Sequence, residues 1–315
     1  MRKFCVLHNV TIEILNYCNS KCVHCYLGQP TPRVNELENV IRVIDQAVDA
    51  GAMQITLTGG EPLLHPHIET IIKYVKSRGL AVNLLTSLNI QKDDWISVVT
   101  LCDKVGVSMY GASPKVHDKI TRINGSFDIM QDNLMYLRDK NVCVTLNITI
   151  MKDNIEDLIN MVAFANQYSV PYRLNYILHG FSHENHQINC DQIGSLKALL
   201  LTNNYEETMS EQFKCAAGTD RLWIDVDLNV YPCVFFRKLL GNLFIDSLST
   251  IWNSSESLAC IRKTSNCDFQ ECRACDLKYF CKPCMGENYN ANGDITKPCA
   301  FNCRIGEYGK HLMDC

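Results

Sequence analysis

The chain has 315 residues, a formal net charge of −4 and 18 cysteines. With 47% hydrophobic and 20% charged residues, the composition is that of a folded protein and not of a disordered one. The near-neutral charge balance excludes a polybasic surface for nucleic acid or membrane. Because the sequence has no signal peptide and no run of 18 apolar residues, we expect a cytoplasmic protein. In a reducing cytosol, so many cysteines indicate metal ligands and not disulfides.

Short apolar runs alternate with helical patterns along the first part of the chain. Strands are predicted over 10–15, 53–58, 80–86, 104–110, 142–150 and 171–178. Helices are predicted over 35–51, 68–79, 92–100, 127–141 and 154–168. Six such β-then-α units imply parallel strands with right-handed crossovers. The expected fold class is therefore α/β, as a partial (β/α)6 barrel; an open doubly wound sheet is the alternative.

The rest of the chain divides in two. We assign residues 1–190 to the barrel, 191–214 to a connector with a helix over 190–203, and 215–315 to a cysteine-rich extension. Only a small β-hairpin (222–226 with 229–232) and short helices near 247–263 are legible in the extension. Its weak apolar periodicity suggests that metal binding supplies part of its folding free energy.

The first cysteine motif follows the first predicted strand. Cys18, Cys22 and Cys25 form a C-x3-C-x2-C pattern. Three thiolates on one loop can hold three irons of a cubane cluster and leave the fourth iron open to a substrate or cofactor. A zinc ion is the alternative, but zinc prefers four protein ligands in a structural site.

The second motif is Gly59-Gly60-Glu61-Pro62, directly after the strand over 53–58. Two glycines permit a close backbone approach to a ligand, and we expect them to leave N–H groups free. A carboxylate at the same mouth can accept hydrogen bonds from an ammonium group.

Together these residues resemble the radical S-adenosylmethionine (SAM) superfamily. The resemblance covers Cys18, Cys22, Cys25 and Tyr26, the TGGEP run at 58–62, and VSMYG at 107–111. It implies a 4Fe–4S cluster on the three cysteines, with SAM bound to the open iron and its amine held by the GGEP stretch. Reductive cleavage of SAM would give a 5′-deoxyadenosyl radical that abstracts a hydrogen atom from the substrate.

The same resemblance suggests further SAM contacts. Thr86 and Ser87 end the strand predicted over 80–86, where relatives often have Thr-Asn-Gly. Ser108 lies on the next strand, Arg122 follows in DKITRINGSF and could pair with the SAM carboxylate, and Asn147 lies near the end of the strand over 142–150.

A second set of nine cysteines fills the extension, at positions 215, 233, 267, 272, 275, 281, 284, 299 and 303. A zinc ribbon would use only four of them. The segment resembles the SPASM extension of radical SAM enzymes that modify peptides and proteins. Asn229 stands where that family usually has glycine, and we expect it to adopt the same left-handed turn. Cys284 comes one residue earlier than in the family pattern.

The resemblance implies two auxiliary 4Fe–4S clusters, and so three clusters in all. The first would use Cys215, Cys233 and Cys284, completed by Cys303 or Cys267 or left open to substrate. The second would use Cys272, Cys275, Cys281 and Cys299. Cys267 is the expected spare cysteine. Outside both sets, Cys102 and Cys143 fall in apolar segments and are expected in the core.

The function that the resemblance implies is modification of a ribosomally made peptide, by a thioether or carbon–carbon crosslink or by epimerisation. Oxidation of a protein side chain, of the formylglycine type, or of a small molecule is the alternative; a haem-pathway substrate is also considered. A non-catalytic iron–sulfur or zinc protein would explain the cysteines but not the GGEP motif.

Implied partners are a peptide or protein substrate and a flavodoxin- or ferredoxin-type electron donor. Since the cluster motif begins by Cys18, we expect leader recognition, if it is needed, to come from a separate protein or from the barrel itself.

Overall fold

The structure is a computed structural model that describes residues 5–28, 31–91, 95–178, 183–189, 192, 215–281 and 283–314. The predicted connector and its helix fall almost entirely outside these residues, as do Cys190 and Cys315. Within the described part, no helix is long and apolar enough to cross a membrane.

Six parallel strands form one continuous sheet in the order of the sequence. They are β1 (Asn9–Glu13), β2 (Gln54–Thr58), β3 (Ala81–Thr86), β4 (Lys104–Met109), β5 (Val144–Thr149) and β6 (Tyr172–Asn175). Each strand pairs with the next one along the chain. The predicted strands and their parallel arrangement are confirmed, and the sheet does not close on itself because β6 lies at one of its edges.

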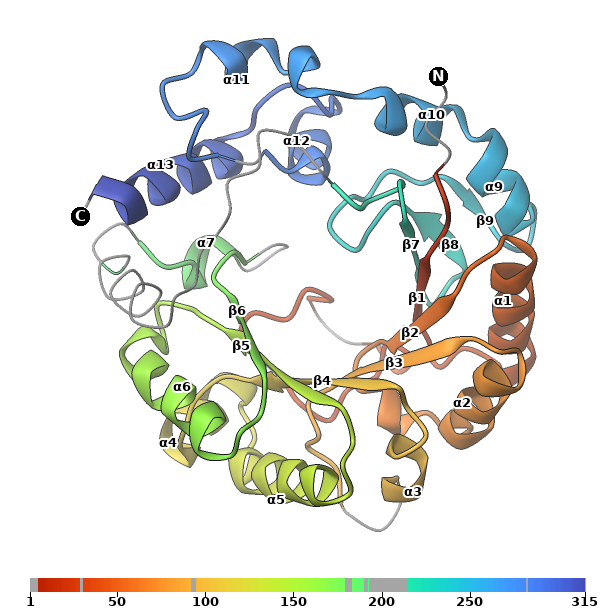
Figure 1. Cartoon of the computed structure of the whole chain (residues 1–315), viewed down its shortest axis with the longest axis vertical. Coiled ribbons are helices and arrows are strands. Elements are labelled where there is room, and N and C mark those ends of the chain that lie inside the picture. Colours follow the sequence, from red (N-terminus) through yellow and green to blue (C-terminus); the bar gives the residue numbers. More distant parts are fainter. Residues whose placement is uncertain are drawn as a thin grey trace.

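Helices connect the strands and cover the outer face of the sheet (Figure 1). They are α1 (Leu37–Asp49), η1 (Pro62–Leu64), α2 (Ile68–Ser77), α3 (Ile96–Val99), α4 (Pro114–Thr121), α5 (Ser126–Asp139), η3 (Ile155–Asp157), α6 (Leu158–Gln167) and α7 (His183–His186). Helix α1 buries Val40, Val43, Ile44 and Ala47, the spacing of one helical face. Helix α4 is short and has few apolar residues, and it was not predicted from the sequence.

The extension continues the same sheet. Strand β7 (Arg221–Ile224) pairs in parallel with β1, on the side that β2 leaves free. Strands β8 (Asn229–Tyr231) and β9 (Gly241–Asn242) follow in antiparallel pairing, so that the sheet has nine strands. The predicted hairpin is therefore correct, but it is a part of the barrel sheet and not an isolated unit.

Short helices follow the hairpin and lie along the top of the view in Figure 1, opposite β3 and β4. They are α9 (Leu248–Ser254), α10 (Glu256–Lys263), η4 (Asn266–Asp268), α11 (Gln270–Ala274), α12 (Met285–Asn292) and α13 (Ala300–Asp314). Helix α9 begins against α1, where the Leu248 N–H donates to the Gln46 side chain at 2.8 Å. The last three helices were not predicted.

The two faces of the strands differ in polarity. Val105, Val107 and Met109 of β4 are buried under the helices, whereas Gly106 and Ser108 face inward and are partly exposed. Strand β5 alternates in the same way. Since side chains alternate across a strand, one face forms the apolar core and the other, more polar face lies on the inner side of the partial barrel.

Two sequence expectations need correction. The left-handed residue of the hairpin turn is Leu228, with φ +62°, and Asn229 instead begins β8. The Asp225 carboxylate accepts from the N–H groups of Asp227 and Asn229, both at 2.9 Å, and so fixes this turn. Cys102 is buried as expected, but Cys143 is exposed because it precedes β5 in a surface turn.

Candidate active site

The loop after β1 brings Cys18, Cys22 and Cys25 together. Burial is the main reason that the pKa of Cys18 is raised to about 11 and that of Cys22 to about 12. A negative charge on a neighbouring thiolate of the loop raises both pKa values further. The backbone of α4 holds the loop from one side: the N–H groups of Lys21 and Val23 donate to the carbonyls of Thr121 and Ile120 at 3.0 and 3.1 Å. Without iron these thiols are protonated at neutral pH, so binding of a cluster must release their protons.

Gly59 and Gly60 hold the start of this loop. A Cβ at Gly60 would lie 2.0 Å from the Tyr17 carbonyl oxygen, and one at Gly59 would lie 2.3 Å from that of Leu15. The Gly60 N–H donates to Leu15 and the Glu61 N–H to Tyr17, at 3.0 and 2.9 Å. We expected this stretch to leave its N–H groups free. That expectation is wrong for the N–H groups of Gly60 and Glu61, because both donate to carbonyls at the start of the cysteine loop.

Glu61 is 1% exposed and joins the ends of β2 and β3. Its Oε1 accepts from the Thr86 hydroxyl at 2.6 Å and from the Leu63 N–H at 3.2 Å. Its Oε2 accepts from the Ser87 N–H and hydroxyl, at 2.8 and 2.7 Å. Burial raises the pKa of Glu61 although all four hydrogen bonds oppose the shift. Thr86 and Ser87 thus lie beside the GGEP stretch, with their hydroxyls directed to the Glu61 carboxylate.

Two tyrosines flank the cysteine loop. The Tyr26 hydroxyl donates to the Gly59 carbonyl at 3.3 Å, and its ring meets the edge of Trp223 at 5.9 Å. Tyr110 follows β4 and hydrogen-bonds to both Cys22 and Ser108. Tyr110 was not singled out from the sequence, although it lies within the VSMYG run. Outer groups of this kind orient cluster ligands and tune their electronic properties.

Ser108 and Asn147 are neighbours on the inner face of the sheet. They are directly paired in the β4–β5 register, and Asn147 is paired in turn with Arg173 of β6. Gly106 makes room for them, since a Cβ there would lie 2.7 Å from the Asn147 amide nitrogen. Arg122 is exposed in a left-handed conformation at the end of α4, one residue past the carbonyl that holds Lys21. The structure thus joins Ser108 with Asn147 and places Arg122 next to the cysteine loop.

Glu13 is a site residue that the sequence analysis missed. It ends β1, is 2% exposed, and accepts from the Trp223 indole N–H at 3.4 Å. Burial raises its pKa to about 7, against smaller opposing effects from Trp223 and Arg237. Its alternation with Ile12 was visible in the sequence, but its contact with β7 was not.

The first auxiliary set is also brought together. The charges of Cys215 and Cys233 act on Cys284, and that of Cys215 acts on Cys233. Burial is the largest cause of the raised pKa of each of the three thiols. These are the three cysteines that the resemblance assigned to one cluster.

The second auxiliary set contains one cysteine more than a cubane needs. Cys281 lies within electrostatic range of four others: Cys272, Cys275, Cys299 and Cys303. Cys303 follows Cys299 by one helical turn at the start of α13, and its N–H donates to the Cys299 carbonyl at 3.1 Å. Cys303 therefore lies in the second set, which argues against its use as the fourth ligand of the first. Cys267, the expected spare, is exposed.

The donor sets fit iron–sulfur clusters in their chemistry. Thiolate sulfur is the usual ligand of such clusters, and all three sets consist of cysteine. Among the described residues, no three His, Cys, Asp or Glu side chains converge as they would around a single metal ion.

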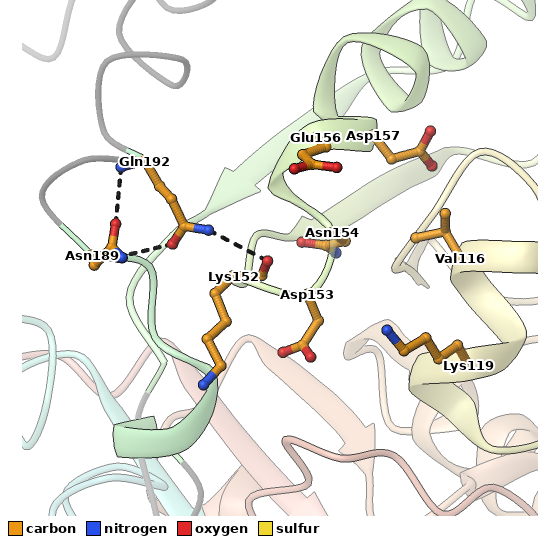
Figure 2. A pocket seen from close by; sticks show the side chains of 9 residues that line it. All are labelled: Val116, Lys119, Lys152, Asp153, Asn154, Glu156, Asp157, Asn189 and Gln192. Carbon is orange, nitrogen blue, oxygen red and sulfur yellow. Dashed lines mark hydrogen bonds between the residues drawn. The ribbon is translucent and has the colours of Figure 1, made fainter.

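A separate cavity of about 430 Å³ lies between α4, the loop after β5 and the side chains of Asn189 and Gln192 (Figure 2). Its lining mixes both charges, including Lys119, Lys152 and Glu156. Other lining groups have partners within the protein: Asp157 accepts from the Ala112 N–H at 2.7 Å, and Asn154 donates to the Tyr110 carbonyl at 2.9 Å. We therefore assign Asp157 and Asn154 a structural role, since their hydrogen bonds support the chain that follows β4.

Family models match both parts of the chain. Residues 12–165 match the radical SAM superfamily, and residues 215–276 match SPASM, an iron–sulfur cluster-binding domain. The chain belongs to the radical SAM superfamily. It is a radical SAM enzyme with a C-terminal SPASM domain, which implies SAM and 4Fe–4S clusters as cofactors.

Individual relatives are more distant. The chain is 26% identical over 268 residues to the antilisterial bacteriocin subtilosin biosynthesis protein AlbA of Bacillus subtilis, covering 78% of this chain and 59% of AlbA. It is 24% identical to an AdoMet-dependent heme synthase of Methanosarcina barkeri, covering 90% and 93% of the two chains. Streptococcus suis SuiB bound to S-adenosylmethionine has the same fold, with a TM-score of 0.76 and 15% identity over 96% of this chain and 78% of SuiB.

Proposed function

We propose that this enzyme oxidatively modifies a ribosomally made peptide, forming a thioether bond to a cysteine of that peptide. The grouping of Cys215, Cys233 and Cys284 without Cys303 carries the proposal. A cubane on three cysteines has one iron free of protein, which can bind a substrate thiolate. The similarity to AlbA, a bacteriocin biosynthesis protein, and to SkfB, a sporulation killing factor maturation protein, supports a peptide substrate.

Each part of the site has a task in this reaction. When bound, the cluster on Cys18, Cys22 and Cys25 together with SAM supplies a 5′-deoxyadenosyl radical that removes a hydrogen atom from the peptide. Gly60 and Glu61 fix the cysteine loop against β2. Ser108 and Asn147 offer polar groups on the inner face of the sheet, where SAM and the substrate carbon would meet. Tyr26 packs against Trp223 and joins the loop to the sheet that carries the first auxiliary set.

The redox balance explains the need for an auxiliary cluster. A thioether forms when the peptide loses two hydrogen atoms: one as an atom to the radical, the other as a thiol proton plus one electron. Cys215, Cys233 and Cys284 would hold the acceptor of that electron. Reduction of the first cluster requires an outside donor, for which we propose a flavodoxin or ferredoxin.

The test is an anaerobic reaction of the reconstituted, reduced enzyme with SAM and a cysteine-containing precursor peptide. We expect 5′-deoxyadenosine, together with a peptide that has lost two hydrogen atoms and one free thiol. Cys233→Ala should still cleave SAM but give unmodified peptide, and Cys143→Ala should behave as the unmodified enzyme. A peptide of unchanged mass that takes up solvent deuterium would mean epimerisation and would refute the thioether proposal.

A haem-pathway substrate is the second candidate. It is favoured by Arg173, an exposed cation that lies opposite Asn147 in the β5–β6 register, since such a group can bind a tetrapyrrole carboxylate. The match to the heme synthase over nearly its whole length supports this candidate as well. Loss of carbon dioxide from an iron-bound coproporphyrin, with no change in any peptide, would favour it over the first.

A further inference from the structure

Two buried asparagines lie between the auxiliary cysteine sets. Asn288 in α12 is 0% exposed and Asn302 in α13 is 3% exposed. Cys284 of the first set immediately precedes α12, and Cys299 of the second set immediately precedes α13. A buried amide is costly unless its donors and acceptor are paired, so the partners of these two side chains show what they hold.

Asn302 binds the backbone of Cys284 from both sides. Its Nδ2 donates to the Cys284 carbonyl at 3.0 Å, and its Oδ1 accepts from the Cys284 N–H at 3.1 Å. The same Nδ2 donates to Asn288 Oδ1 at 2.6 Å, so both donors of this amide are used.

Asn288 continues the chain of bonds to the second set. Its Oδ1 accepts from the Cys299 N–H at 3.1 Å, and its Nδ2 donates to the Ile295 carbonyl at 3.0 Å. The Cys281 thiol also donates to the Asn302 carbonyl at 3.6 Å. That last bond is lost when the thiol gives up its proton to bind iron. The hydrogen bonds made by the two side-chain amides involve no thiol, so loss of the thiol protons does not remove them.

We propose that Asn288 and Asn302 form an amide bridge that couples the two auxiliary cysteine sets, so that both clusters assemble as one unit. The bridge fixes Cys284 of the first set relative to Cys299 of the second. Asn288 and Asn302 are therefore positioning residues: they act through the cysteine backbone and do not touch iron or substrate. The inference rests on the cluster assignment made above, but not on the identity of the substrate.

The test compares cluster loading in three variants of the full chain, reconstituted anaerobically. Asn302→Ala and the isosteric Asn302→Asp both remove the donor to Cys284 and to Asn288. Asn290→Ala is the matched control, since this α12 amide also binds backbone, at Phe235 and Arg237, but is exposed and touches no cysteine. Iron and sulfide per chain are measured together with 5′-deoxyadenosine formation, which reports the cluster on Cys18, Cys22 and Cys25.

The unmodified protein and Asn290→Ala should bind about twelve irons per chain, as expected for three cubanes. Both Asn302 variants should bind about four, a threefold loss, and still form 5′-deoxyadenosine. About eight irons in either variant would mean that one auxiliary cluster is lost alone, and about twelve that neither depends on the bridge; both results overturn the proposal. Loss of all three clusters in both variants would make the bridge a general folding element and would overturn the proposal as well.

If the unmodified protein binds only about four irons, the cluster assignment itself fails. None of these readouts needs a peptide, so failure of the proposed function is recognised separately.

Discussion

The cysteine loop at 18–25 and the cysteine-rich segment at 272–303 are held by different means. The first is bonded to strand ends and to α4, over a sheet whose outer face is fully buried. The second contains α11, in which no residue is buried, and includes the exposed Cys275 and Cys303. An apolar core can therefore position one cluster site in advance, whereas the other site depends on hydrogen bonds from the Asn288 and Asn302 side chains and on the metal itself.

The close approach of Gly60 is the strongest structural demand of the first region. Gly60→Ala would put a Cβ against the Tyr17 carbonyl, and the cysteine loop would have to move. We expect 5′-deoxyadenosine formation to fall about a hundredfold, as displacement of a reacting group by an ångström commonly does. The control is Gly293→Ala, where the new Cβ meets nothing within 4 Å. It should cost only about 1 kcal/mol from its left-handed backbone. Equal activity of the two variants would show that the loop is not held by this contact.

Removal of iron should separate the two regions. In iron-free protein we expect backbone amides of 270–303 to exchange with solvent within about tenfold of the unfolded rate, because few apolar contacts hold them. Amides of β1 to β5 should keep their protection, because their core does not involve the clusters. Hydrogen exchange followed by mass spectrometry checks both. Equal loss of protection throughout the chain would contradict the comparison.

Glu13 tests how the extension acts on the barrel through β7. Because its carboxyl has a pKa of about 7 in the folded chain and about 4.5 when unfolded, folding favours the protonated form. The contribution of Glu13 to the free energy of unfolding should therefore be fully present below pH 4.5. It should be lost as the pH rises through 7, a loss of about 3 kcal/mol. Glu13→Gln should therefore stabilise iron-free protein by about this amount at pH 8 and by little at pH 4, in urea unfolding. The exposed Glu38→Gln should stay within about 0.5 kcal/mol at both. A pH-independent effect of Glu13→Gln would exclude this account.

The smallest expected effect concerns the ion pair between Arg33 and Asp227. It joins the chain after the cysteine loop to the hairpin turn at 2.5 Å, with both side chains half exposed. Arg33→Ala should change the free energy of unfolding by less than about 1 kcal/mol, and less still in high salt. A larger loss in thermal unfolding would mean that the two regions are joined by charge more than by the shared sheet.

Much of the barrel could be predicted from the sequence because its signals are local. The alternation of strands and helices, the three-cysteine motif and the GGEP run each lie within short stretches of sequence. Helices α12 and α13 were not predicted because their sequences show little apolar periodicity. Asn288 and Asn302 are buried at positions where an amphipathic helix would have apolar residues. Tyr110 was missed as a cluster neighbour because nothing in its own segment shows that it meets Cys22.

The 18 cysteines and their spacing indicated by themselves a metal-binding protein with an open three-cysteine site and a second region of thiolate ligands, and the resemblance to radical SAM enzymes implied SAM at the first site. Only the tertiary structure decided that β7 joins β1, that Glu13 meets Trp223 across 210 residues, and that Cys303 lies with Cys281. The reason is physical: spacing fixes which thiols can share a loop, but strand pairing and buried hydrogen bonds between distant segments decide which loops share a cluster.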